Sequence, residues 1–219
     1  MEMKDIIRAW SLSKELNYFN PPASEDELQT AESKIGRKLP DAMRELYLFS
    51  NGGDLLQGNL QIFKLMEPDP KKKFVELVGG SDQLREWHYE IPKEVLTFAH
   101  DGSEDHFGIW LPETHNPKFP CPVLEIGQIS NARSMAIQAT DFIPFLAART
   151  AYFLLPYVGT DSALDALGIP GWLRAYPDNA ELYPLLRVWA DPWLPDPDPD
   201  CYEKAYDRFA LADIFQSKI

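Results

Sequence analysis

The stretch that decides the fold is Leu39-Pro40-Asp41-Ala42-Met43-Arg44-Glu45-Leu46-Tyr47-Leu48-Phe49-Ser50-Asn51-Gly52-Gly53. Proline is tolerated in the first turn of a helix, because its missing N–H would have no partner there. Asn or Gly after the last turn can adopt the left-handed conformation that ends a helix. Between these signals, Met43, Leu46 and Tyr47 recur at helical spacing. The stretch therefore predicts a short helix with one buried face, closed by Asn51-Gly52-Gly53.

A second helix is predicted just before this stretch. Ser24 and Glu27 have the spacing of a capping box, in which each side chain accepts a hydrogen bond from the other residue's amide. The apolar stripe of this helix consists of Leu28, Ala31 and Ile35. Gly36 is suited to end it. Together the two segments predict a helical hairpin.

The hydrophobic pattern then changes to that of strands. Strands are predicted over residues 60–65, 74–78, 95–99, 106–111 and 123–129. The third and fourth of these flank a polar turn at residues 101–105, as in a β-hairpin. Ser81, which follows Gly79-Gly80, is predicted to cap a helix that runs through Trp87.

An apolar helix over residues 142–155, capped by Thr140 or Asp141, ends the first of two predicted regions. Residues 1–155 predict an α+β domain with an antiparallel or mixed sheet flanked by helices. Residues 156–219 predict a helical, aromatic-rich C-terminal extension packed on the helix 142–155. Aromatic residues at helical spacing usually fill cores, but an exposed aromatic binding surface remains the alternative for this extension.

The charge of the chain limits its partners. The 219 residues include 34 acidic and 21 basic side chains, which gives a formal net charge of −13. Such a balance argues against nucleic-acid binding, since that affinity comes from neutralising phosphates. Two interpretations remain open: the charge keeps the protein in solution, or it faces a basic protein partner.

The cysteine content and the apolar segments indicate a cytoplasmic protein. Cys121 and Cys201 are the only cysteines, too few for a disulfide framework or a zinc site. The N-terminal residues lack the basic and apolar regions of a signal peptide. The most apolar segment, residues 142–158, contains Arg149 in its middle and predicts a buried helix instead of a membrane span.

Possible metal ligands crowd together in one segment, His100-Asp101-x-x-x-Asp105-His106. Two imidazoles and two carboxylates suit a transition metal. A hairpin turn, however, selects the same Asp, Gly and Ser residues for its own backbone, and this interpretation is favoured. Nucleophile motifs and phosphate-binding glycine loops are missing from the sequence. We therefore assign no catalytic, cofactor-binding or metal-binding residue and expect neither a cofactor nor an enzyme.

Three segments carry a recognisable pattern. They are Ala31-Glu32-x-x-Ile35-Gly36-x-x-Leu39-Pro40, Leu46-Tyr47-x-x-Ser50-Asn51-Gly52-Gly53, and Ile91-Pro92-x-x-Val95-Leu96-x-Phe98-Ala99-x-Asp101-Gly102. Over about residues 20–150, the chain resembles the SUKH superfamily of bacterial immunity proteins, which are related to a fungal regulator of cell-wall glucan synthesis. The third segment usually continues into a Gly-Asp pair in that family, whereas Ser103-Glu104-Asp105 stands here.

The resemblance implies a function in protein binding without catalysis. It suggests an immunity protein that neutralises a toxin, often a nuclease, by direct binding, and a basic toxin domain would be its partner. The alternative that the resemblance suggests is an intracellular scaffold or regulatory adaptor like the fungal regulator.

Overall fold

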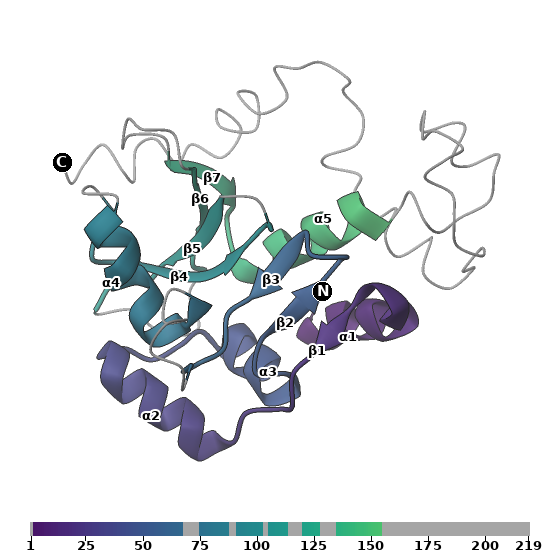
Figure 1. Cartoon of the computed structure of the whole chain (residues 1–219), viewed down its shortest axis with the longest axis horizontal. Helices are drawn as coiled ribbons and strands as arrows, with labels where there is room; N and C mark the ends of the chain where they lie inside the picture. Colours follow the sequence, from purple (N-terminus) through teal and green to yellow (C-terminus); the bar gives the residue numbers. More distant parts are fainter. Residues whose placement is uncertain are drawn as a thin grey trace.

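The computed structural model describes residues 2–67, 75–87, 91–102, 105–113, 120–127 and 135–154. Within these residues the chain is an α+β protein, in which five α-helices surround a seven-stranded sheet (Figure 1). The predicted fold class is therefore confirmed for this part of the chain. The predicted C-terminal extension, residues 156–219, lies outside the described residues.

The described elements have the following bounds. The helices are α1 (Met3–Leu12), the 3-10 helix η1 (Lys14–Leu16), α2 (Glu25–Ile35), α3 (Asp41–Phe49), α4 (Leu77–Trp87) and α5 (Phe142–Leu154). The strands are β1 (Tyr18–Phe19), β2 (Gly53–Leu55), β3 (Leu60–Ile62), β4 (Val95–His100), β5 (His106–Trp110), β6 (Val123–Ile126) and β7 (Met135–Ala139).

The sheet is an antiparallel meander. Its strands lie in the order of the sequence, β1 to β7, and each pairs with its neighbours in antiparallel fashion. The predicted hairpin is β4–β5, which is confirmed. Of the two predicted sheet types, antiparallel and mixed, the structure has the antiparallel one.

An irregularity in β4 increases the apolar surface that faces the helices. The register with β5 shifts between Thr97 and Ala99, so the alternation of side chains restarts there and Phe98 is accommodated as an extra core residue. The Phe98 ring packs edge to face on Phe142 and Phe145 of α5, with centroids 5.2 and 5.8 Å apart. This contact joins α5 to the centre of the sheet.

The predicted helical hairpin is confirmed as α2 and α3. The Ser24 oxygen accepts a hydrogen bond from the Glu27 amide, the Glu27 carboxylate accepts from the Ser24 amide, and Gly36 ends α2 in the left-handed conformation with φ of +75°. The predicted buried face of α3, including Met43 and Tyr47, lies in the core.

A buried carboxylate holds the two helices of the hairpin together. Glu32 of α2 is only 3% exposed and accepts hydrogen bonds from Lys38 Nζ at 2.7 Å, the Leu39 amide at 3.0 Å and Arg44 Nη1 at 2.7 Å. Burial by itself raises the pKa of Glu32, but these donors outweigh it and the net pKa is lowered. The stabilisation is therefore present above the ordinary Glu pKa and is lost as the pH falls through the lowered one.

Asn51-Gly52-Gly53 does not cap α3 in the way the sequence predicts. The helix ends at Phe49, and Ser50 follows it in an extended conformation with φ of −152°. Gly52 does adopt a left-handed φ of +76°, but it does so one turn later, where the chain enters β2. Asn51 Oδ1 accepts from the Leu65 amide at 2.8 Å, so the segment joins the helical hairpin to the sheet.

Two predictions around α4 are wrong. Of the residues predicted as the strand 74–78, Leu77 and Val78 instead form the start of α4, and Glu76 makes a single bridge to Lys64. Ser81 lies inside α4 and not at its start, because its Oγ accepts from the Thr97 amide at 2.8 Å and fixes the helix on β4. Tertiary contacts thus override the Gly79-Gly80 signal. The helix α1 and the strands β1, β2 and β7 were not anticipated from the sequence.

Gly52 tests the structural role of the Asn51-Gly52-Gly53 segment. A Cβ at Gly52 would lie 2.6 Å from the Ile62 carbonyl oxygen, whereas a Cβ at Gly36, with nearly the same φ, meets nothing within 4 Å. We expect Gly36→Ala to cost about 1 kcal/mol of unfolding free energy through backbone strain alone. Gly52→Ala should cost about 2–4 kcal/mol, because the clash adds to the strain. Urea unfolding of both variants measures this, and equal losses would contradict the clash.

Glu32 tests the anchoring of the hairpin. We expect Glu32→Ala to lower the free energy of unfolding by about 2–3 kcal/mol, because the buried Leu39 amide loses its acceptor and two cations lose their partner. The control is Glu45→Ala on the exposed side of α3, for which a change within about 0.5 kcal/mol is expected. Denaturant unfolding at neutral pH measures both, and a Glu32 variant as stable as the control would contradict the anchoring role.

Candidate functional site

The β4–β5 hairpin brings the two predicted histidines together. His100 and His106 lie directly opposite each other in the register of β4 and β5, with ring centroids 5.9 Å apart. Both rings pack on Phe63, at 5.7 and 6.3 Å. The three residues form an aromatic cluster on one face of the sheet.

The aspartate next to His100 is paired with an arginine. Asp101 forms an ion pair of 3.6 Å with Arg149 of α5. The Arg149 guanidinium stacks over the ring of Phe107, 4.7 Å from its centroid, and donates to the Asn59 carbonyl at 3.3 Å. Because Phe107 follows His106 in the strand, the two side chains point to opposite faces of the sheet. The sheet therefore separates the histidines from the group around Arg149.

This separation removes the geometry that a metal site needs. Among the described residues, no group of three or more His, Cys, Asp or Glu side chains is placed to hold a metal ion. The favoured interpretation of the segment as a turn agrees with its backbone: the Asp101 amide donates to the Asp105 carbonyl at 3.1 Å, and Gly102 has a φ of +81°.

His100 is held in its neutral form. Burial lowers its pKa, and the carboxylates of Asp101 and Asp54 only partly oppose this effect. The Gly102 amide donates to His100 Nδ1 at 3.1 Å. A nitrogen that accepts a hydrogen bond carries no proton, so the proton of the neutral ring is on Nε2. The His100 side chain thus offers one N–H donor.

Glu125 of β6 belongs to the group around Arg149. Its pKa is raised, first by burial and then by the charge of Asp105, while Arg149 opposes the shift. The Gln138 amide donates a hydrogen bond to the Glu125 carboxylate. The charges of Asp101, Asp105 and Arg149 therefore all act on Glu125, on the side of the sheet that faces α5.

The described cysteine has no reactive character. Cys121 is fully buried, and burial raises the pKa of its thiol to about 12, with a further contribution from Asp141. A thiol with such a pKa is not a nucleophile at neutral pH. Cys201 lies outside the described residues.

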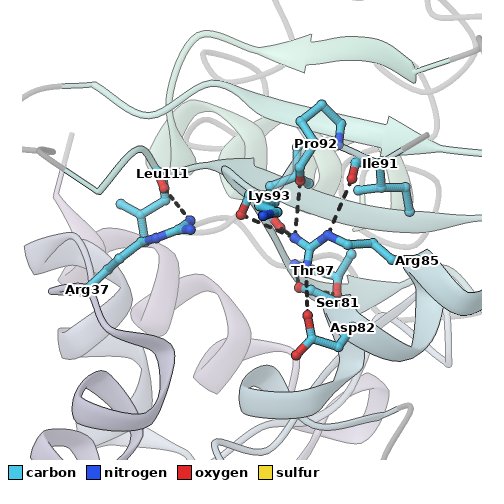
Figure 2. Close-up of polar contacts among 10 residues, drawn as sticks. Arg37, Ser81, Asp82, Arg85, Ile91, Pro92, Lys93, Thr97 and Leu111 are labelled. Atoms are coloured by element: carbon cyan, nitrogen blue, oxygen red, sulfur yellow. Dashed lines mark hydrogen bonds and ion pairs between the residues drawn. The ribbon is translucent and has the colours of Figure 1, made fainter. Parts of the chain in front are cut away.

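The third family-like segment is held by an arginine clamp. The Arg85 guanidinium of α4 donates to the carbonyls of Ile91, Pro92 and Lys93, at 3.3, 3.1 and 3.2 Å, and also to the carbonyl of Val95 and the carboxylate of Asp82 (Figure 2). Nε donates to Ile91 and Nη1 to Asp82, while the two hydrogens of Nη2 are shared among three backbone carbonyls. The clamp fixes the chain where it enters β4.

A second arginine connects the α2–α3 hairpin to the residue that follows β5. Arg37, just after α2, donates to the Leu111 carbonyl at 2.7 Å (Figure 2). The quoted family-like segments therefore meet in space, but their polar residues bind the protein's own backbone. In this structure these polar residues hold the scaffold together.

Sequence reasoning anticipated the histidines but missed the residues around them. Phe63 follows β3, Arg149 lies on α5 and Glu125 lies on β6. No local motif marks these residues. The only signal for Arg149 was a charge inside an otherwise apolar helix, which indicates a buried partner. The assembled groups are two partly buried imidazoles packed on the buried ring of Phe63, with carboxylates nearby.

The neutral state of His100 gives a pH dependence. Since the folded pKa lies below the ordinary value, unfolded chains bind the proton more readily, and stability should fall as the pH drops below about 6.5. We expect His100→Asn to reduce this pH dependence, because an Asn oxygen can still accept from the Gly102 amide without titrating. Denaturant unfolding between pH 7.5 and 5 measures the slope for both proteins. An unchanged slope in the variant would contradict the assignment.

Comparison with known proteins supports the resemblance found in the sequence. The family model described as SMI1 / KNR4 family (SUKH-1) matches residues 22–148. A search of curated proteins finds no match to the chain. No helix in the described segments has the length and apolar character needed to cross a membrane. The family model spans more than half of the chain and includes the hairpin α2–α3, the arginine clamp and the β4–β5 hairpin. The chain therefore belongs to the SMI1 / KNR4 family (SUKH-1).

Proposed function

We propose that this protein is an immunity protein of the cytoplasm that binds a toxin directly and thereby neutralises it. The observation that carries this proposal is the family match over residues 22–148. Proteins of this family are generally binding proteins without catalytic activity, and many of the bacterial members act as immunity proteins. The proposal therefore requires a protein partner and no cofactor.

The charge of the family domain supports a basic partner. The matched range, residues 22–148, contains 20 acidic and 12 basic side chains, counted along the sequence. The excess of acid is thus a property of this domain and not only of the chain beyond it. Nucleases that act on phosphate backbones carry basic surfaces, and complementary charge speeds association and aids the choice of partner.

The internal ion pairs leave much of this charge free to act at long range. Glu32 is neutralised inside the hairpin by Arg44 and Lys38. In contrast, Asp41 and Asp54 lie exposed on α3 and β2. Such exposed carboxylates create a negative potential that steers a basic partner toward the domain.

The second candidate function is an intracellular scaffold or regulatory adaptor. The same family name, which joins SMI1 and KNR4, favours it. The two functions differ in their partner: an immunity protein binds one toxin, whose gene is expected beside its own, and an adaptor has no such neighbour.

Co-expression with a toxin-like protein encoded by the adjacent gene tests the proposal. We expect the full chain to restore growth and to co-purify with the toxin. Association should slow as the salt concentration rises from low to physiological strength, because screening acts over about 8–10 Å. Dissociation should change less.

The controls separate specific neutralisation from other effects. The Gly36→Ala variant, which keeps the surface charge, should rescue growth like the wild type. An uncharged osmolyte at the same osmolarity should leave the association rate unchanged. A toxin that is neither bound nor neutralised would contradict the immunity function and favour the adaptor.

A further inference from the structure

A line of side chains crosses the face of the sheet that points away from α5. Its members, named here the outer row, are Tyr18, Asp54, Gln61, His100 and His106. Each is directly opposite the next in the register of β1 to β5. Directly opposite residues of an antiparallel pair place their side chains on the same face, with Cβ atoms about 5 Å apart. The outer row is therefore continuous over about 20 Å, given strands about 4.8 Å apart.

The two ends of this line differ in exposure. At the β6 end the next residue in register is Ile126, which is buried in a small cluster with Leu84 of α4. At the β1 end, Tyr18 is 67% exposed and Asp54 is also exposed. Helix α4 thus covers one end of this face, and the other end reaches solvent.

The chemistry of the exposed end suits a cation. The charges that act on His100 are the carboxylates of Asp101 and Asp54. Tyr18 presents an aromatic ring next to the Asp54 carboxylate in the register. A guanidinium stacked on a tyrosine ring gains a cation–π contact and can pair with a carboxylate at the same time. Gln61 and the Nε2–H of His100 continue the row with hydrogen-bonding groups.

We propose that the outer row is the docking surface for a cationic segment of the partner protein, with an arginine of that partner stacked on Tyr18 and paired with Asp54. The inference rests on the proposed function and adds the surface and the recognised side chain. Arginine fits better than lysine, because its planar guanidinium stacks and binds carboxylates in a bidentate manner. A second copy of this chain fits worse, since it carries the same negative net charge of −13 and would be repelled.

A peptide titration tests the surface without any toxin. The probe is acetylated hexa-arginine, added to the isotope-labelled full chain at low ionic strength, with hexa-lysine for comparison. We expect amide shifts centred on the outer row and tighter binding of hexa-arginine. Shifts centred instead on the exposed carboxylates at the start of α2, Glu25 to Glu27, or equal binding of both peptides, would overturn the proposal.

Paired variants test the two contacts separately. Asp54→Asn should weaken hexa-arginine binding about tenfold and Tyr18→Leu about threefold to tenfold, while Tyr18→Phe keeps it within about twofold. The matched controls are Glu86→Gln and Trp87→Leu on α4, where Glu86 is exposed and Trp87 is 54% exposed. These controls should bind like the wild type. Weakening in the controls equal to that in the outer row would overturn the proposal.

The toxin assay distinguishes failure of the surface from failure of the function. If the wild type neutralises the adjacent toxin and the Tyr18→Leu, Asp54→Asn double variant does not, while the α4 controls do, both proposals stand. If the double variant, with an unchanged melting curve, still neutralises the toxin, the surface is wrong and the function is right. If these substitutions change only self-association in sedimentation experiments, the occupant is a second copy and the proposal fails.

Discussion

The register of the antiparallel meander is the constraint on which the rest of the structure depends. Because side chains alternate between the two faces, the register alone decides which residues meet the helices and which meet solvent. The irregularity at Phe98 in β4 adds one more aromatic ring to the helix side, where α5 packs. The same alternation places His106 and Phe107 on opposite faces, so it also separates the histidine cluster from the group around Arg149.

Polar side chains hold the helices to one another and to this sheet. Glu32 joins α2 to α3, Arg85 clamps the entrance of β4, and Ser81 fixes α4 on Thr97. Buried polar groups of this kind are costly unless all their partners are in place, so they specify one arrangement of the elements. The segments that identify the family contain or contact these groups. The match to the family therefore reports on residues that hold the scaffold together.

The titratable groups of the sheet are shaped by burial and by close partners. Burial lowers the pKa of His100 and raises that of the Cys121 thiol, Asp101 is paired with Arg149, and Glu125 accepts a hydrogen bond from Gln138. In the function that we propose, the negative charge of the domain supplies long-range attraction and the outer row supplies short-range selectivity. These two contributions act at different distances, so they need not come from the same residues.

The sequence by itself determined the features that depend on neighbours along the chain. The capping box of Ser24, the left-handed Gly36 and the β4–β5 turn follow from local rules, and the fold class follows from periodicity. Tertiary structure decided the rest. Helix α4 forms through Gly79-Gly80 because β4 binds Ser81, and the two-residue strand β1 exists only because β2 pairs with it. The alignment of Tyr18, Asp54 and His100 was likewise invisible in the sequence, since a register between strands is fixed by the packing of the whole sheet and not by any spacing along the chain.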